Sequence, residues 1–326
     1  MILYLKESDT ARLLTMHDAI RLVEDAARAL GEGRAVNCPR QRPRTDSTMM
    51  HVLPAAYGGA DVMGLKVYTA GKRGTAFYYL LFNGEGKLLA LLEANTLGAI
   101  RTGAASAVAT RYMSREESST LGIIGTGHQA RTQLEAVSHV RNLTRIRAWS
   151  RTRERLDPFV AEMSKKIGKP IEAAPSAQEA VAGADIVITM TTTTDPVLRG
   201  AWISPGAHLN VAGSNHIHRR EVDGEAVERS GIVAVEDLAQ AIVEAGDLKI
   251  AVDEKMFKWD RAVLLGDIVA GKTPGRHAAD EITMFKSLGI GLWDAVVARH
   301  IYDLAVVEHA GVELPVEEPL RARSAR

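Results

Sequence analysis

Lys66 is the residue of this sequence whose setting points most directly to chemistry. It lies in the stretch Gly64-Leu65-Lys66-Val67-Tyr68, between apolar neighbours in a run typical of a strand. A lysine in an apolar, partly buried site has a lowered pKa and can exchange protons with a bound substrate. The alternative is a surface lysine whose stem covers apolar neighbours while its amine reaches water, and the sequence does not decide between the two.

Arginines are the second group of residues that could take part in binding or catalysis. Arg101 lies in the alanine- and glycine-rich stretch 95–113, which we expect to be a helix. Arg40 and Arg42 lie in the proline-containing segment 37–44, which we expect to be extended, so their side chains share one face. A guanidinium binds a carboxylate or phosphate through two parallel hydrogen bonds. The alternative in each case is a solvated charge.

A dinucleotide-binding motif occupies residues 121–130. The apolar run 121–124 predicts a buried parallel strand, and Gly125, Gly127 and Ala130 follow it in the pattern G-x-G-x-x-A. The first glycine permits a tight turn, the second permits close approach of a pyrophosphate, and the alanine lets the next helix pack on the strand. Free N–H groups at the start of that helix favour phosphate. We therefore expect cofactor contacts from Gly125, Thr126, Gly127, His128 and Gln129.

The end of the next expected strand, 145–149, indicates which nucleotide is bound. NAD-binding domains usually place an Asp or Glu there to hold the ribose 2′-hydroxyl. Here Ser150, Arg151 and Thr152 follow the strand, and no carboxylate does. A hydroxyl and a guanidinium suit a 2′-phosphate. We therefore expect NADP as the cofactor, ahead of NAD; the alternative is a solvated helix start.

Two kinds of sheet are needed to position these residues. Short strand-like runs separated by turn residues predict a mostly antiparallel sheet at 49–53, 62–69, 75–82 and 87–93. After the polar linker 114–119, strands and helices alternate, which is typical of a Rossmann-type, doubly wound parallel sheet. The fold class is therefore α/β, with a second α+β domain. We place the Rossmann dinucleotide-binding domain at 118–293 and the second domain at 1–117 with 294–326.

Helical periodicity is also present at both ends of the chain. We expect one helix over 11–33 and a long helical region over 280–310, interrupted near 288–291. The later half of that region is amphipathic, and we expect it to pack on the N-terminal domain. The tail 316–326 is charged and lacks periodicity, so we expect it to be disordered.

Composition narrows the classes of function. The 40 basic and 40 acidic residues leave no net field that would favour nucleic acid or an anionic membrane as a partner. A lone cysteine, Cys38, cannot form an intrachain disulfide and suits a reducing compartment. With neither a signal-peptide pattern nor an apolar run long enough to span a bilayer, we expect a cytoplasmic protein. No metal-ligand spacing is evident, so we expect no metal.

Five motifs together resemble the ornithine cyclodeaminase/mu-crystallin family of NAD(P)-dependent proteins, in the family's order over nearly the whole chain. They are 64–68, 99–106, 125–130, 210–215 with Arg220-Glu221 after it, and 284–289. This family includes cyclodeaminases, amino-acid dehydrogenases, and reductases of ketimines and of iminosuccinate. The resemblance implies that the second domain binds substrate and forms a homodimer through the N-terminal sheets.

The resemblance also assigns roles to residues. Lys66 would lie next to the amino or imino nitrogen of the substrate, and Arg101 would bind its carboxylate. A second carboxylate arginine is matched best by Arg40 and next by Arg42. His51 and Asn215 are expected to line the substrate site. Further cofactor contacts are expected from Thr102, Thr191, Val211, Gly213, Ser214, Ser287 and Gly289.

One departure from the family pattern bears on the reaction. Cyclodeaminases carry an aspartate where this sequence has Asn215, and an amide cannot act as a general base. We therefore expect an NADP-dependent enzyme that reduces an α-imino acid or cyclic ketimine, or reductively aminates a 2-oxo acid, to an L-amino acid, reversibly. The alternatives are an amino-acid cyclodeaminase with bound NAD, and a non-catalytic binder of a small ligand.

Overall fold

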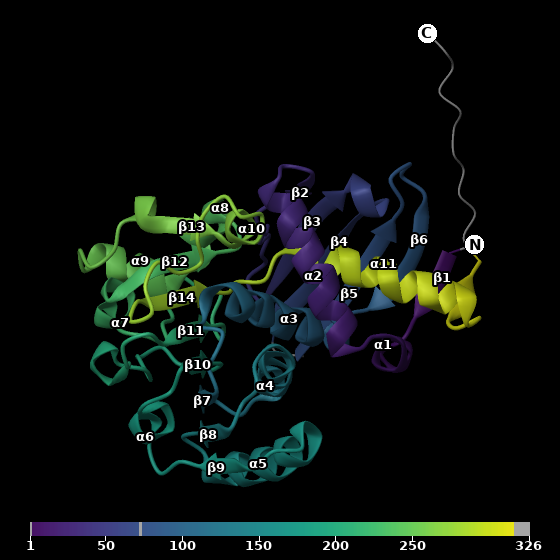
Figure 1. Ribbon diagram of the computed structural model, residues 1–326. Coiled ribbons are helices and arrows are strands. Elements are labelled where there is room, and N and C mark those ends of the chain that lie inside the picture. Colours follow the sequence, from purple (N-terminus) through teal and green to yellow (C-terminus); the bar gives the residue numbers. More distant parts are fainter. Residues whose placement is uncertain (1, 72–73, 316–326) are drawn as a thin grey trace.

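The computed structural model describes residues 2–71 and 74–315, which form two sheets with helices packed on them (Figure 1). The α/β prediction, with one doubly wound parallel sheet and one mostly antiparallel sheet, is confirmed. The expectation for the tail 316–326 concerns residues outside those described.

The first sheet has seven strands in the order β15-β1-β6-β5-β4-β3-β2. All neighbours are antiparallel except β1 and β6, which are parallel. Asn83 and Gly86 close the expected turn between β5 and β6 with a 3.0 Å backbone hydrogen bond. The strands are β1 (Ile2–Leu5), β2 (Ala35–Asn37), β3 (Thr48–Tyr57), β4 (Val62–Gly71), β5 (Gly74–Phe82), β6 (Leu88–Glu93) and β15 (Val312–Leu314).

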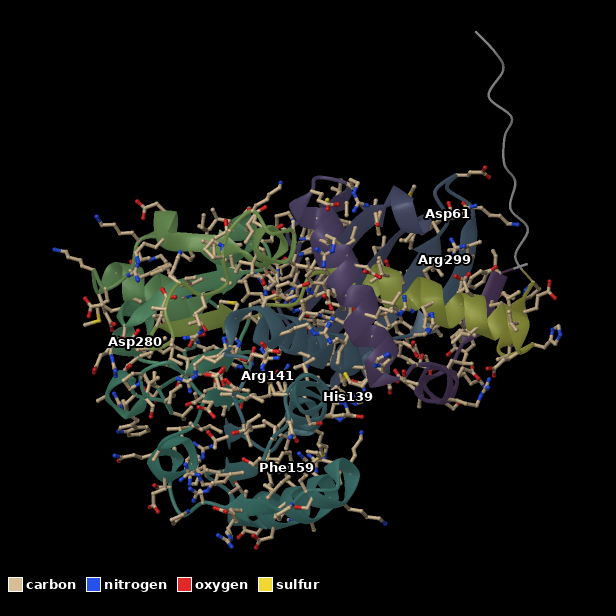
Figure 2. The ribbon with its side chains drawn as sticks, viewed as in Figure 1. Asp61, His139, Arg141, Phe159, Asp280 and Arg299 are labelled. Carbon is tan, nitrogen blue, oxygen red and sulfur yellow. The ribbon has the colours of Figure 1, made fainter. Side chains whose placement is uncertain are left out.

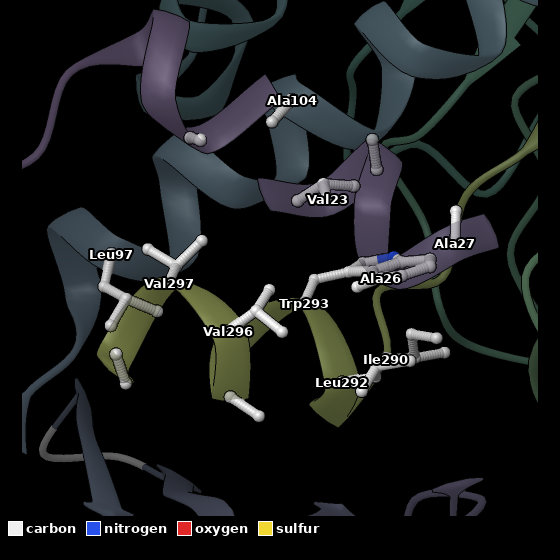
Figure 3. Close-up of a cluster of buried hydrophobic side chains, with 14 of the residues drawn as sticks. Val23, Ala26, Ala27, Leu97, Ala104, Ile290, Leu292, Trp293, Val296 and Val297 are labelled. Atoms are coloured by element: carbon white, nitrogen blue, oxygen red, sulfur yellow. The ribbon is translucent and has the colours of Figure 1, made fainter. Parts of the chain in front are cut away.

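Helices α1 (Glu7–Leu13), α2 (Met16–Gly31), α3 (Asn95–Met113) and α11 (Gly291–Val307) cover one face of this sheet (Figure 1). The single helix expected over 11–33 is wrong, because Thr15 begins a new helix by accepting a hydrogen bond from the Asp18 N–H at 3.1 Å. The amphipathic α11 packs on α2 and α3, as predicted. Figure 3 shows the side chains between these helices: Val23, Ala26, Ala27, Leu97, Ala104, Trp293, Val296 and Val297.

The second sheet is wholly parallel, in the order β13-β12-β14-β11-β10-β7-β8-β9. Its strands are β7 (Thr120–Ile124), β8 (Arg145–Trp149), β9 (Ile171–Ala173), β10 (Ile186–Thr189), β11 (His208–Val211), β12 (Ser230–Val235), β13 (Ala262–Leu264) and β14 (Ile282–Lys286). The connecting helices are α4 (His128–Val140), α5 (Arg153–Ile167), α6 (Ala177–Val181), α7 (Gly224–Glu228), α8 (Leu238–Glu244), α9 (Gly246–Asp253) and α10 (Leu265–Val269).

The helical expectation for 280–310 is wrong in its first half, because β14 lies inside the parallel sheet between β11 and β12. All five residues of β14 are buried, and periodicity does not distinguish a short, fully buried strand from a buried helix segment. This strand leads straight into α11, which returns to the first sheet. There Arg299 of α11 donates to Asp61 at 2.9 Å, and both residues are labelled in Figure 2.

Candidate active site

Two neighbouring rows of side chains on the helix-covered face of the first sheet form the floor of the site. Strand pairing aligns Leu53, Lys66 and Tyr79 in one row. It aligns His51, Tyr68 and Phe77 in the next row. Because side chains alternate along a strand, residues two apart on β4, such as Lys66 and Tyr68, face the same way.

Lys66 is 2% exposed, which excludes the surface-lysine interpretation. Its Nζ lies 3.0 Å from Asp294 Oδ1 and 5.2 Å from the centre of the Phe77 ring. Burial lowers the pKa of the Lys66 ammonium to about 8, an effect that Asp294 opposes and Arg101 reinforces. Lys66 is therefore poised to change protonation state near neutral pH.

Asp294 is a site residue that the sequence did not reveal. It is fully buried in the first turns of α11, and its Oδ1 accepts from Lys66 Nζ and, at 3.1 Å, from Arg101 Nε. Arg101 is itself buried, and its Nη1 has no partner among the residues described. A carboxylate inside the apolar run 290–298 was the available signal, because an acid is rarely buried unpaired.

Arg40 and Arg42 share a second buried carboxylate, Glu244 of α8. Arg42 Nη1 lies 2.6 Å from Glu244 Oε1, and Arg40 Nε lies 3.7 Å from the same oxygen. Burial raises the pKa of Glu244, and the two arginines oppose that rise. Arg40 Nη2 also donates to the Leu288 and Gly289 carbonyls at 2.7 and 2.9 Å.

Of the two arginines, only Arg40 lines the cavity above Lys66. Arg42 does not line the cavity; it donates to the Asn215 carbonyl at 2.9 Å and to His51 Nδ1 at 3.3 Å. Burial and the charges of Arg40 and Arg42 lower the pKa of His51 to about 4, so its ring is neutral. His51 is not among the residues that line the cavity, and its direct contact with substrate stays a prediction.

The cavity has a volume of about 450 Å³ and lies where the two sheets meet. Lys66, Arg40 and Arg101 line it together with Asn215. No Asp or Glu appears among the described residues of its lining. Six of the expected cofactor contacts also line it: Thr102, His128, Gln129, Gly213, Ser287 and Gly289.

A second cavity of about 360 Å³ adjoins the first, since Met190 and Thr192 line both. It holds the other expected cofactor contacts Gly125, Thr126, Gly127, Ser150, Arg151, Thr152 and Thr191, and also Arg155, which the sequence analysis did not single out. The predicted contacts therefore fall along one continuous groove, with two exceptions. Val211 and Ser214 line neither cavity: Val211 is buried in β11, and the Ser214 carbonyl accepts from Lys286 Nζ at 2.7 Å.

The groove fits a dinucleotide. Gly125 has φ +106°, and a side chain there would overlap the Met190 carbonyl. Nothing lies within 4 Å of a Cβ built on Gly127, so its backbone is open to a phosphate. Gly127 caps α4 without a side-chain hydrogen bond, which leaves the first N–H groups of that helix available.

Buried carboxylates that the sequence analysis missed hold the loops of this groove. Glu221 accepts from the Thr191 and Gly213 N–H groups at 2.6 and 2.7 Å. Glu236 accepts from the N–H groups of Leu288 and Gly289 at 2.7 and 2.8 Å. These hydrogen bonds fix backbone on both sides of the cavity. Such contacts depend on long-range packing, which no local sequence pattern encodes.

Across residues 2–71 and 74–315, no three His, Cys, Asp or Glu side chains gather to hold a metal ion. In the same residues, no helix is both long and apolar enough to cross a bilayer.

Comparison with known proteins gives a consistent result. The profile of the "Ornithine cyclodeaminase/mu-crystallin family" matches residues 3–309. A Delta(1)-pyrroline-2-carboxylate reductase of Bacillus cereus is 36% identical over 269 residues, covering 80% of this chain and 82% of that protein.

Two solved structures extend the similarity to the fold. The Thermococcus litoralis Delta(1)-pyrroline-2-carboxylate reductase in complex with NADH and L-proline superposes with a TM-score of 0.92 at 34% identity, over 96% of this chain and 100% of that one. An archaeal alanine dehydrogenase dimer with bound NAD gives a TM-score of 0.90 at 28% identity, over 96% and 98% of the two chains.

Proposed function

We propose that this chain, which belongs to the ornithine cyclodeaminase/mu-crystallin family, reduces the C=N bond of a small α-imino acid or cyclic ketimine with NADPH. It is an oxidoreductase with a nicotinamide cofactor. The product would be an L-amino acid, and the reaction would be reversible. The observation that carries the proposal is the pair Lys66 and Arg101, which share the buried carboxylate of Asp294 and both line a cavity continuous with the dinucleotide groove.

Charge in the site favours an anionic substrate. Lys66 and Arg101 share Asp294, and Arg40 and Arg42 share Glu244, so each pair of cations faces a single carboxylate. A substrate carboxylate supplies a negative charge that the protein lacks. The unpartnered Nη1 of Arg101 is the group best placed to bind it. This contact would fix the orientation of the substrate.

Lys66 supplies the proton of the reaction. When bound, the nicotinamide supplies a hydride to the imine carbon. The Lys66 ammonium donates its proton to the imine nitrogen, so that C=N becomes CH–NH. In the oxidative direction the neutral amine of Lys66 takes the proton back. Asp294 holds the amine in place during both steps, because it accepts from Lys66 inside the protein.

Cyclodeamination has less support from this cavity. A diamino acid carries a second ammonium, and no described lining residue is an Asp or Glu that could pair with it. Asn215 lines the cavity with a neutral amide instead. Simple binding of a ligand does not require a buried lysine in the cavity lining, whereas proton transfer does.

A panel of substrates tests the proposal. Delta(1)-pyrroline-2-carboxylate, its six-membered homologue, and 2-oxo acids with ammonia or methylamine would be incubated with NADPH, and absorbance of NADPH followed. We expect steady consumption with at least one of them. A lyase that regenerates its own cofactor, or a binder, would show none.

Cofactor preference is a separate prediction: the protein should use NADPH in preference to NADH. Ser150 and Arg151 line the adenosine end of the groove. The acidic residue in the described lining of that cavity is Asp195, which lies on a different loop. Losing a charged phosphate contact costs on the order of 1.5–3 kcal/mol, or about ten- to a hundredfold in affinity. Ser150→Asp should reverse the preference in kcat/KM.

Arg153→Ala is the matched control for cofactor choice. Arg153 is the first residue of α5 and lies close in sequence to Ser150 and Arg151. It pairs with Asp157 at 3.0 Å and does not line the groove. Its loss should leave the ratio of kcat/KM for NADPH and NADH unchanged. A preference for NADH in the unmodified protein would contradict the prediction.

The outer face of the first sheet supports association. The helices cover the other face, while Met50 and Tyr78 are 41% and 39% exposed on this one. Exposed apolar side chains gathered on one face of a sheet are typical of an interface. Alternation along β3, β4 and β5 puts these further residues on the same face: Val52, Pro54, Met63, Leu65, Val67, Leu80 and Phe82.

We therefore expect a homodimer through this face, measured by light scattering at micromolar concentration. Val67→Glu should shift the protein towards monomer, because Val67 lies between Val52 and Tyr78 in the strand register. Val306→Glu on α11 is the control, since Val306 is exposed elsewhere. A monomeric unmodified protein would contradict the prediction. We also place the protein in the cytoplasm, where its exposed, unpaired Cys38 would stay reduced.

A further inference from the structure

The row His51, Tyr68 and Phe77 is an aromatic ladder beside Lys66. The His51 and Tyr68 rings are stacked at 4.2 Å with an interplanar angle of 4°, and the Tyr68 and Phe77 rings lie 4.7 Å apart. Tyr68 and Phe77 line the substrate cavity, whereas His51 lies behind Tyr68. Arg42 donates to His51 Nδ1 and so fixes the imidazole. The position of the Tyr68 ring is therefore determined by its neighbours on both sides.

The hydroxyl of Tyr68 is oriented as well. Its oxygen accepts a hydrogen bond from Arg40 Nη1 at 3.2 Å. Among the residues that the structure describes, none accepts the hydroxyl hydrogen. A phenol that accepts from a cation is a better donor, because the hydrogen bonds polarise one another. Since Tyr68 lines the cavity, this hydrogen is available to a bound anion.

Arg40, by contrast, has much of its donor capacity occupied. Its Nη2 is taken up by the Leu288 and Gly289 carbonyls, and its Nη1 already serves Tyr68. Glu244 lies beside its Nε. Arg40 therefore holds backbone and Tyr68 in place with part of its guanidinium, while its Nε has no hydrogen-bond partner among the residues described. Tyr68 adds a neutral donor to the cations Lys66, Arg40 and Arg101, which line the same cavity.

We propose that Tyr68 is a substrate-contacting residue whose hydroxyl donates to the substrate carboxylate opposite Arg101, while its ring forms the wall against which the carbon skeleton packs. This inference rests on the proposed function, and it deepens it by naming a neutral ligand of the carboxylate. Arg40 and His51 also position Tyr68. The site would thus recognise a carboxylate through a neutral donor as well as through its cations.

Tyr68→Phe tests the inference, because it removes only the hydroxyl. We expect the KM for Delta(1)-pyrroline-2-carboxylate to rise about tenfold or more, with little change in kcat. For the same ring without its carboxylate, Delta(1)-pyrroline, Tyr68→Phe should behave like the unmodified protein. Tyr302→Phe is the matched control, because Tyr302 lies on α11 and lines neither cavity.

Calorimetric titration of L-proline and pyrrolidine into protein saturated with NADP⁺ repeats the comparison without turnover. Weaker binding of L-proline to Tyr68→Phe, with pyrrolidine unaffected, supports the inference. Equal binding of L-proline to both proteins overturns it and leaves the proposed function intact. If the unmodified protein consumed NADPH with no member of the substrate panel and did not bind L-proline, the proposed function would fail, and this inference with it.

Discussion

Lys66→Met is expected to lower kcat for imine reduction by about a hundredfold or more, as the loss of a general acid does. Methionine is unbranched and apolar and is one atom shorter than lysine, so it fills most of the space beside Phe77 without the amine. Affinity for the cofactor should hardly change, because Gly125, Gly127 and Arg151 lie in the adjoining cavity. Steady-state kinetics and a fluorescence titration with NADPH would measure the two effects separately.

The pH profile gives the same prediction a second readout. Burial lowers the pKa of Lys66 to about 8, so the ammonium that donates a proton predominates below that pH. Reduction should therefore slow as pH rises through about 8, and oxidation should accelerate over the same range. Both limbs should be absent in Lys66→Met. Lys87→Met, at an exposed turn, is the control and should keep both limbs. Near-normal turnover of Lys66→Met would make this lysine structural.

The parts of the site that could be predicted from the sequence are those encoded within a few residues. Gly125, Gly127 and Ala130 predict the dinucleotide groove because each has a steric role within one strand-turn-helix unit. Ser150 and Arg151 were located because they directly follow a strand. Lys66 was recognised by its apolar neighbours, but its burial depends on α11, which begins far along the chain.

Partners that meet only in the folded chain could not be predicted in the same way. Asp294 contacts Lys66 across 228 positions of sequence, and the contact requires α11 to cross back over the first sheet. The stacking of His51 on Tyr68 requires the register of β3 against β4, and a shift of one residue would turn either ring to the other face. Alternation predicts which residues share a face of one strand, whereas register decides which of them touch.

Gly98 has no reactive group, but the Lys66–Asp294 contact requires that this position carry no side chain. It lies in the first turns of α3, where a Cβ would overlap Lys66 Nζ and would meet no other side chain or backbone atom so closely. The amine therefore reaches Asp294 by passing over a position that has no side chain. We expect Gly98→Ala to displace the amine and lower kcat by about ten- to a hundredfold.

Stability should respond differently to Gly98→Ala. Alanine is the better helix former by about 1 kcal/mol, and the atom that it meets is the end of a flexible side chain. The melting temperature should stay within about 4 °C of the unmodified protein, since the helix gain offsets the weakened Lys66–Asp294 pair. A large fall in melting temperature would mean that α3 itself had moved.

A double-mutant cycle separates displacement of the amine from any other effect of the methyl group. In the Lys66→Met protein there is no amine to displace, so adding Gly98→Ala should cause no further loss of kcat. If the two losses were additive instead, the methyl group would be acting on the cavity through a route independent of Lys66. Non-additivity in kcat with additive melting temperatures would place the coupling in the chemistry of the amine and not in packing.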